Sequence, residues 1–336
     1  MATQTSNGHA FEYALTLAIK EYLENNFKLG ARIKIMETTA AFVNAKKDFL
    51  SLTLKSQAKY LAASRVAIKN TVPAEPCLWA WLLFEKTSLL FLTLQPDNMG
   101  KEGDVRDILL SCPQKGWEIG FSVKHNHAAT KHPRVAISID FGKEWLGVPC
   151  SPTYFAEIAQ TFSTLKLYAG THTRWSTLGK TRQEKNKDIY APVLLAFRKE
   201  LTSLLKTDTL NRMKALLDYL LGREDFYKII FIDHVRKSYV DLLGFNLAGK
   251  LNQPCVLALG EIPPTLVVNK LEYPTKLVSI ELDPLHIGTL LVVFDKDWAF
   301  SFRLHNACEF VENSLKFDIR LTKMPVELWR QRIPLI

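Results

Sequence analysis

The sequence contains few cysteines, and their spacing excludes the usual cysteine-based scaffolds. The five cysteines are far apart, odd in number and never arranged as a CxxC pair. This pattern argues against a disulfide framework and against a zinc site built from cysteine. We therefore expect the protein to work in a reducing, cytosolic environment.

Long hydrophobic runs and nucleotide-binding loops are also missing. The longest apolar stretch, residues 78–92, is interrupted by Glu85 and Lys86, whereas a membrane-spanning helix needs ~20 mainly apolar residues. A buried hairpin or a helix–strand pair is the better interpretation of this stretch. The first residues, MATQTSNGH, lack the pattern of a secretory signal peptide. No Walker or GxGxxG pattern occurs that would indicate a nucleotide-binding loop.

Acidic residues are outnumbered by basic ones. The chain has 43 Lys and Arg against 34 Asp and Glu, a formal net charge of +9 and a pI near 9.2. This balance suggests nucleic acid or another anionic surface as a partner, although it says nothing about the fold. With 336 residues, 47% of them hydrophobic, the chain can bury a core in two domains or in one domain with a large insertion.

Hydrophobic periodicity predicts an α/β protein with a β-rich C-terminal part. Apolar residues at helical spacing indicate an amphipathic helix over residues 8–27 and a strongly basic helix over 41–69. Further helices are expected after Pro152 and over residues 192–222. Runs rich in β-branched and aromatic residues predict strands at 105–112, 117–124 and 134–141, and later at YKIIFIDHV, LVVNKLEY, TKLVSIEL, TLLVVFDKDWAFSFRLH and SLKFDIRL.

Two of these runs form a predicted antiparallel hairpin, because the intervening Pro113-Gln114-Lys115-Gly116 has the composition of a turn. A turn centred between Gln114 and Lys115 places Asp107 opposite the segment that runs from Ser122 to Lys124. Side chains two apart on a strand share a face, ~7 Å from one another along the strand. The hairpin is therefore expected to bring Asp107, Ser122 and Lys124 together.

This combination of residue types suits the hydrolysis of a phosphodiester. A carboxylate and a backbone carbonyl can hold a divalent metal against the scissile phosphate, while a lysine positions or activates the attacking water. These roles would fall to Asp107, the Val123 carbonyl and Lys124. The alternative is an exposed ion pair with a structural role, which is common across a hairpin. The apolar residues around the pair and the basic residues after it favour the catalytic interpretation.

Basic and polar residues after the hairpin are candidates for contacts with DNA. The stretch HNHAATKHPR follows the lysine directly, and THTRWSTLGKTRQEKNK interleaves basic residues with a tryptophan. For the first stretch, the alternative is a transition-metal site at the histidines. For the second stretch, the alternative is a solvated loop. Arginine and lysine of the second stretch are types that read guanine in the major groove, and the sequence does not choose among them. The predicted contacts are His125, Asn126, His127, Lys131, Arg134, Arg174, Lys180 and Arg182.

Three segments, GHAFEYAL, GDVRDILL and WEIGFSVKHNHAATKH, resemble those of the HaeIII-type type II restriction endonucleases, a branch of the PD-(D/E)xK nuclease superfamily. The run from Gly103 to His132 carries the most specific part of the resemblance. The resemblance implies a Mg2+-dependent endonuclease that makes a blunt cut in double-stranded DNA at GGCC. It also implies a prokaryotic, cytoplasmic enzyme of a restriction–modification system, paired with a cognate DNA methyltransferase and present as a monomer or homodimer.

The resemblance further implies a fold and a division into domains. A PD-(D/E)xK nuclease core, a mixed sheet flanked by helices, is expected over residues 1–165 and carries the catalytic hairpin. Residues 166–336 are expected to form a basic DNA-binding and recognition region, with a helical insertion before the β-rich part. The alternative function is a basic nucleic-acid-binding protein that does not cut, in which the acids of the hairpin only order the fold.

The sequence departs from the superfamily pattern at the second acid. The superfamily's aspartate and lysine map to Asp107 and Lys124, but Ser122 stands where a glutamate or aspartate is usual. A carboxylate from elsewhere is therefore expected to complete the metal site. Glu12 is the preferred residue, because it is a lone acid on the apolar side of the first helix, where an unpaired charge is costly. The candidates are Glu12, Glu157 and, at the rim of the site, Asp104.

Overall fold

The structure is a computed structural model that describes residues 4–27, 32–78, 88–96, 99, 103–126, 129–234, 237–257 and 260–335. It divides into two compact units, each assembled from separate segments of the chain. The first unit comprises residues 1–128, 222–271 and 326–336, and the second comprises 129–221 and 272–325. This division differs from the expected boundary at residues 165 and 166, because the chain returns to the first unit twice.

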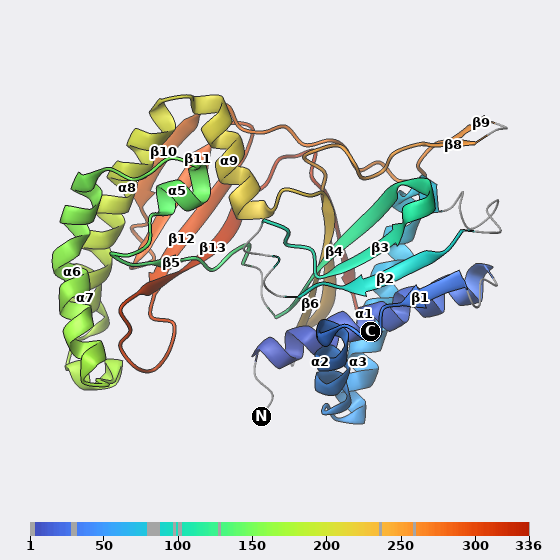
Figure 1. Cartoon of the computed structure of the whole chain (residues 1–336), viewed down its shortest axis with the longest axis horizontal. Helices are drawn as coiled ribbons and strands as arrows, with labels where there is room; N and C mark the ends of the chain where they lie inside the picture. Colours follow the sequence, from blue (N-terminus) through green and yellow to red (C-terminus); the bar gives the residue numbers. More distant parts are fainter. Residues whose placement is uncertain are drawn as a thin grey trace. The chain divides into compact units, whose positions relative to one another are not determined.

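The first unit is built on a seven-stranded mixed sheet flanked by helices (Figure 1). β1 pairs with β2 and β4 with β6 in parallel, whereas the other neighbours pair antiparallel. A separate pair of short strands, β8 (Cys255–Leu257) and β9 (Gly260–Ile262), follows β7 in the chain. The order in the main sheet is β1 (Ile33–Ile35), β2 (Leu90–Leu94), β3 (Ile108–Cys112), β4 (Trp117–His125), β6 (Phe226–His234), β7 (Lys237–Phe245) and β14 (Trp329–Pro334).

Three N-terminal helices pack against this sheet and form its main core. Phe11 of the first helix is fully buried and contacts Phe231 of β6, with ring centroids 5.5 Å apart. Phe121 and Val123 of β4 belong to the same buried cluster. None of the helices in the described ranges is long and apolar enough to cross a membrane. The three helices are α1 (Gln4–Phe27), α2 (Ala40–Leu50) and α3 (Leu54–Thr71).

The basic helix expected over residues 41–69 is two helices in the structure. The break comes before α3, where Thr53 adopts an extended conformation and its side chain accepts a hydrogen bond from the Ser56 N–H. Thr39 caps the start of α2 in the same way. These side-chain hydrogen bonds satisfy N–H groups that have no partner at the start of a helix. The hydrophobic periodicity of the sequence continues across the break, so it does not reveal the start of the second helix.

The predicted hairpin of β3 and β4 is present. Ile108 lies opposite Phe121, and a short 3-10 turn over Pro113–Lys115 joins the strands. Gly116 closes this turn with a φ of 68°, a conformation that favours glycine. If the pairing of Ile108 with Phe121 is extended by one residue, Asp107 lies opposite Ser122 of β4. This is the position expected from the turn.

The second unit contains a five-stranded antiparallel sheet in the order β10-β11-β12-β13-β5. Helices cover one of its faces, where Phe302 and Phe317 pack against Phe197 and Trp145. The strands are β5 (Arg134–Val135), β10 (Leu277–Leu282), β11 (Thr289–Phe294), β12 (Ala299–His305) and β13 (Leu315–Lys323). The helices are α5 (Phe141–Leu146), α6 (Pro152–Gly170), α7 (Arg182–Lys185), α8 (Ala191–Lys206) and α9 (Thr209–Leu221).

Two elements expected in this unit have different bounds. The strand expected over residues 134–141 is shortened to β5, because a turn follows it in which the Ile139 N–H donates to the Ala136 carbonyl. Asp140 then caps α5 by accepting a hydrogen bond from the Lys143 N–H. The helix expected over 192–222 is divided into α8 and α9 near Asp208, whose φ of 49° is incompatible with a continuous helix. The helix expected after Pro152 is α6.

Other expectations concern segments between these elements. LVVNKLEY, residues 266–273, was expected as a strand but forms an irregular segment. β7 and β14 were not expected, although both extend the main sheet. Of the apolar stretch 78–92, residues 79–87 lie outside the described part, and β2 begins within its last residues.

Candidate active site

The centre of the candidate site is the carboxylate of Asp107, which lies immediately before β3. Its Oδ2 atom accepts hydrogen bonds from the Val123 N–H at 2.5 Å, from Lys124 Nζ at 3.0 Å and from Ser122 Oγ at 3.2 Å. Asp107 and Lys124 are both half-buried, so water screens this pair less than a surface pair. The structure thus brings together the acid, the serine and the lysine of the predicted group.

Backbone hydrogen bonds hold Asp107 at the point where β3 begins. Its N–H donates to the Phe121 carbonyl of β4 at 2.7 Å, and its carbonyl accepts from the Gln95 N–H at 2.9 Å. The Val123 N–H donates to the Asp107 side chain, and not to a backbone carbonyl of the neighbouring strand. Because the N–H and carbonyl of a residue within a strand point to the same edge, the Val123 carbonyl is expected on the edge of β4 that adjoins β3.

The two faces of β4 have different surroundings. Phe121 and Val123 are buried in the core that α1 forms with the sheet. Ser122 and Lys124 point to the other face, because side chains alternate along a strand. The helices therefore fix the position of β4, while the reactive side chains lie on the face away from them.

β6 contributes a second lysine that the sequence analysis missed. Lys228 is aligned with Ser122 in the parallel pairing of β6 and β4, so their side chains point to the same face. Lys228 is only 5% exposed. Burial lowers its pKa from 10.5 to about 7, with a contribution from the charge of Lys124 that Asp107 partly opposes. The available signal was a lysine inside the apolar run YKIIFIDH, where a charge is costly.

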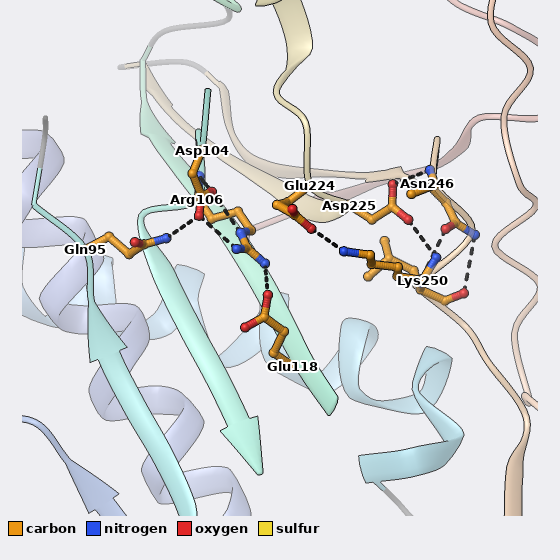
Figure 2. A network of polar contacts seen from close by, with 10 residues as sticks. Gln95, Asp104, Arg106, Glu118, Glu224, Asp225, Asn246 and Lys250 are labelled. Atoms are coloured by element: carbon orange, nitrogen blue, oxygen red, sulfur yellow. Dashed lines mark hydrogen bonds and ion pairs between the residues drawn. The ribbon is translucent and has the colours of Figure 1, made fainter. Parts of the chain in front are cut away.

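An ion-pair network lies beside the candidate site (Figure 2). Arg106 binds Asp104 through Nε and Nη2, both at 2.8 Å, and Glu118 through Nη1 at 2.5 Å. Gln95 also donates to Asp104, at 2.8 Å. Burial alone would raise the pKa of Asp104, but the bonds from Arg106 and Gln95 outweigh it and lower that pKa. Asp104 is therefore held as an anion that neutralises the arginine.

Gly120 allows this network to form. A Cβ atom at this position would come within 2.1 Å of Arg106 Cδ and 2.8 Å of its Cγ. The aliphatic part of Arg106 therefore crosses β4 directly over the glycine, on the way to Glu118. This close approach explains a glycine in the middle of a buried strand.

The acids predicted as further metal ligands have different surroundings. Asp104 belongs to the Arg106 network, and Glu12 is half-buried on α1, the helix that packs against β4. Glu157 lies on α6 of the second unit, where it pairs with Lys199. Within the part of the chain that the structure describes, no three His, Cys, Asp or Glu side chains form a group suited to a metal ion. The acid that accompanies the aspartate of the hairpin therefore stays a prediction.

The residues directly after the hairpin have structural contacts. His125 packs against Tyr60 and Phe231, with ring centroids 4.9 and 5.5 Å apart, on the face covered by helices. It therefore points away from the face that carries the lysine of the hairpin, where a phosphate was expected. Asn126 has a φ of 53°, and its side chain accepts a hydrogen bond at 2.8 Å from a backbone N–H of β6. His127 lies outside the described residues.

The remaining predicted DNA contacts lie in the second unit, and most of them have protein partners. The pairs are Lys131 with the Tyr219 carbonyl, Arg134 with Glu312, Arg174 with Glu309 and Lys180 with Asp188. Arg182 is exposed in the first turn of α7. Exposed ion pairs contribute little stability, so a DNA phosphate can compete for their basic partners. The role of these residues in DNA binding remains a prediction.

Comparison with known proteins defines the class of this protein. The chain matches the family described as HaeIII restriction endonuclease over residues 8–325, and it belongs to that family. The type II restriction enzyme HaeIII of Haemophilus aegyptius is 33% identical over 324 residues, which cover 96% of this chain and 95% of that enzyme. No solved structure matches the chain.

Family membership confirms the resemblance that the three sequence segments indicated. The protein is therefore an enzyme, a type II site-specific deoxyribonuclease. The alternative of a nucleic-acid-binding protein that does not cut is set aside by this membership.

Proposed function

We propose that the protein hydrolyses phosphodiester bonds of double-stranded DNA at GGCC in a Mg2+-dependent reaction. The proposal includes a PD-(D/E)xK nuclease core in the first unit, with Asp107 as its acid and Lys124 as its lysine. The main support is the convergence of three hydrogen-bond donors, among them Lys124, on one oxygen of Asp107. The choice of GGCC rests on the resemblance to the HaeIII-type enzymes.

The oxygen atoms at this point of the sheet suit a hard cation. The Val123 carbonyl is expected on the edge of β4 that adjoins Asp107, and Mg2+ binds one or two carboxylates together with water and substrate phosphates. In the described part of the chain, the side-chain bonds of Asp107 end on Oδ2, which leaves Oδ1 for a cation. Asp107 and Val123 would hold the ion. The further ligand preferred from the sequence is Glu12, which lies on α1, on the helix-covered side of the sheet. Bound there, Mg2+ supplies a Lewis acid for the scissile phosphate.

Lys124 and Ser122 have different roles in this proposal. The Lys124 ammonium, 3.0 Å from Asp107 Oδ2, donates hydrogen bonds to the attacking water and to a phosphate oxygen. Ser122 donates to the same carboxylate at 3.2 Å and fixes its orientation. Ser122 therefore orients Asp107, and it does not replace the second metal-binding acid that the superfamily usually has at this position.

The proposal extends to the biological setting that the resemblance implies. A cognate methyltransferase would protect the host DNA, as a functional and not a physical partner. The enzyme would act in the prokaryotic cytoplasm as a monomer or homodimer. The basic region within residues 166–336 would contribute to DNA binding, with Arg174, Lys180 and Arg182 among its contacts.

Plasmid cutting in Mg2+ and in EDTA tests the proposed site. Asp107→Asn and Lys124→Ala should each reduce cutting by at least about 100-fold, because each removes a group that acts on the reacting phosphate. Binding of a GGCC duplex in Ca2+ should persist in both variants. Asp241→Asn is a matched control: its carboxylate lies on β7 and is 21% exposed, against 23% for Asp107, and it also pairs with a basic residue. Near-normal cutting by either active-site variant would exclude this site.

A further inference from the structure

The sheet of the second unit has a polar face that carries a compact charged group. Arg303 on β12 lies opposite Asp318 on β13, and Arg320 follows two residues later on β13. All three side chains therefore point to the same side of the sheet. Their neighbours Phe302 and Phe317 are fully buried on the opposite side, against α5 and α8. The charged group is thus on the face that these helices leave uncovered.

One buried carboxylate holds both arginines. Asp318 Oδ2 accepts from Arg303 Nη2 at 3.1 Å, and from Arg320 Nε at 3.2 Å and Nη2 at 2.9 Å. The Asp318 side chain is 4% exposed, whereas the two arginine side chains are 49% and 50% exposed. Burial alone would raise the pKa of Asp318, but the bonds and charges of the arginines lower it. A fixed anion therefore lies beneath two guanidinium groups that reach outward.

Some buried polar atoms of this group lack a protein partner. His305 lies on β12, two residues after Arg303. Within the described ranges, neither Oδ1 of Asp318 nor Nε2 of His305 has a hydrogen-bond partner. His132 Nδ1 lies 3.9 Å from that oxygen, beyond hydrogen-bond distance. Buried polar atoms in folded proteins are almost always satisfied. The polar groups of this face therefore exceed those that its described protein partners satisfy.

Arginines held in this way are suited to read guanine. Arginine makes paired hydrogen bonds to O6 and N7 of guanine in the major groove, the commonest base-specific contact of proteins with DNA. An acid that binds some N–H groups of an arginine directs the remaining ones outward and reduces the side-chain entropy lost on binding. Two arginines on one acid can contact two guanines of neighbouring G·C pairs.

We propose that Arg303 and Arg320, positioned by Asp318, form the guanine-reading pair of this enzyme. The inference rests on the proposed function, a cut at a site made of G·C pairs, and gives that function a recognition element. Lys316 and Arg134 face each other across β13 and β5 on the same side of the sheet. They supply positive charge for the phosphates that flank the bases. Charge complementarity therefore favours duplex DNA as the occupant of this face.

Binding measurements with two duplexes test the inference. Arg303→Ala and Arg320→Ala should each weaken binding to a GGCC duplex in Ca2+ by about 10- to 100-fold, the range for one lost base contact. Binding to a duplex without the site should change by less than about threefold, because only one charge is lost. Arg332→Ala is a matched control, since Arg332 is 55% exposed and pairs with an acid on the sheet of the first unit. The control should keep the wild-type ratio of specific to non-specific binding.

A base analogue separates a direct contact from a general loss of structure. 7-Deazaguanine lacks the N7 acceptor, so wild-type protein should bind a substituted site more weakly, whereas Arg320→Ala should be insensitive to it at the guanine that Arg320 reads. Arg320→Lys keeps the charge but not the paired geometry, and should bind the GGCC duplex more weakly than the wild-type protein. Equal sensitivity of all proteins at every guanine would overturn the inference. If wild-type protein cuts no duplex in Mg2+, the proposed function fails instead.

Discussion

Lys228 allows the cost of a charge beside the candidate active site to be measured. Its side chain is almost completely buried next to Ser122, and its pKa is lowered from 10.5 to about 7. We expect Lys228→Met, a side chain of similar length without a charge, to stabilise the folded protein at neutral and acidic pH. The wild-type protein must instead either bury an ammonium group or release its proton on folding.

The magnitude follows from the difference between the two pKa values. The unfolded chain binds the proton below about pH 10.5, and the folded chain only below about pH 7. The lysine therefore lowers the free energy of unfolding by its full amount below pH 7. This destabilisation disappears as the pH rises toward 10.5. At 1.36 kcal/mol per pKa unit, the difference between 10.5 and about 7 corresponds to roughly 4–5 kcal/mol.

Urea unfolding of both proteins at pH 6, 8 and 10 measures this effect. The gain in the free energy of unfolding of Lys228→Met should be largest at pH 6 and should decrease steadily toward pH 10. Lys34→Met is a suitable control, because Lys34 is exposed on β1, and its gain should be small at every pH. A gain for Lys228→Met that is the same at pH 6 and pH 10 would refute the reasoning.

Three further substitutions test other parts of the first unit. Gly120→Ala should lower the free energy of unfolding by about 1–3 kcal/mol, because the added methyl group displaces Arg106 from its ion pairs. An unchanged free energy of unfolding would mean that Arg106 can move aside. Glu75→Gln should stabilise the protein at pH 8 but not at pH 4, because burial raises the pKa of Glu75 to about 7 and its deprotonation above that pH is costly. Equal gains at both pH values would contradict this explanation. Glu12→Gln should reduce cutting by orders of magnitude and raise the Mg2+ requirement without changing thermal unfolding. Normal cutting by Glu12→Gln beside an inactive Glu157→Gln would instead favour the acid on α6.

The local part of the candidate site could be predicted from the sequence. Asp107, Ser122 and Lys124 lie in one hairpin, whose turn is marked by Pro113 and Gly116. The period of a strand and the position of the turn are enough to align such residues. For the same reason, the hairpin itself was predicted correctly, although the fate of later segments such as LVVNKLEY was not.

The rest of the site depends on pairings between distant segments. Lys228 reaches Ser122 through the parallel pairing of β4 and β6, and no local pattern specifies which strand a buried run will join. The role of Gly120 is visible only when Arg106 lies across it. His125 was assigned to the phosphate by its position in the sequence, but its aromatic contacts place it on the covered face. Tertiary packing decided each of these cases.

The distance between β4 and β6 along the chain also affects how the enzyme folds. Their pairing closes a loop over residues 126–225 that contains α5 to α9, whereas only a short turn separates β3 from β4. Closing a long loop costs more entropy, and sheets with distant pairings fold slowly. We therefore expect a refolding intermediate in which Asp107 and Lys124 already meet but the neighbouring strand is absent. Nuclease activity should return only in the slow phase of refolding, after the hairpin has formed.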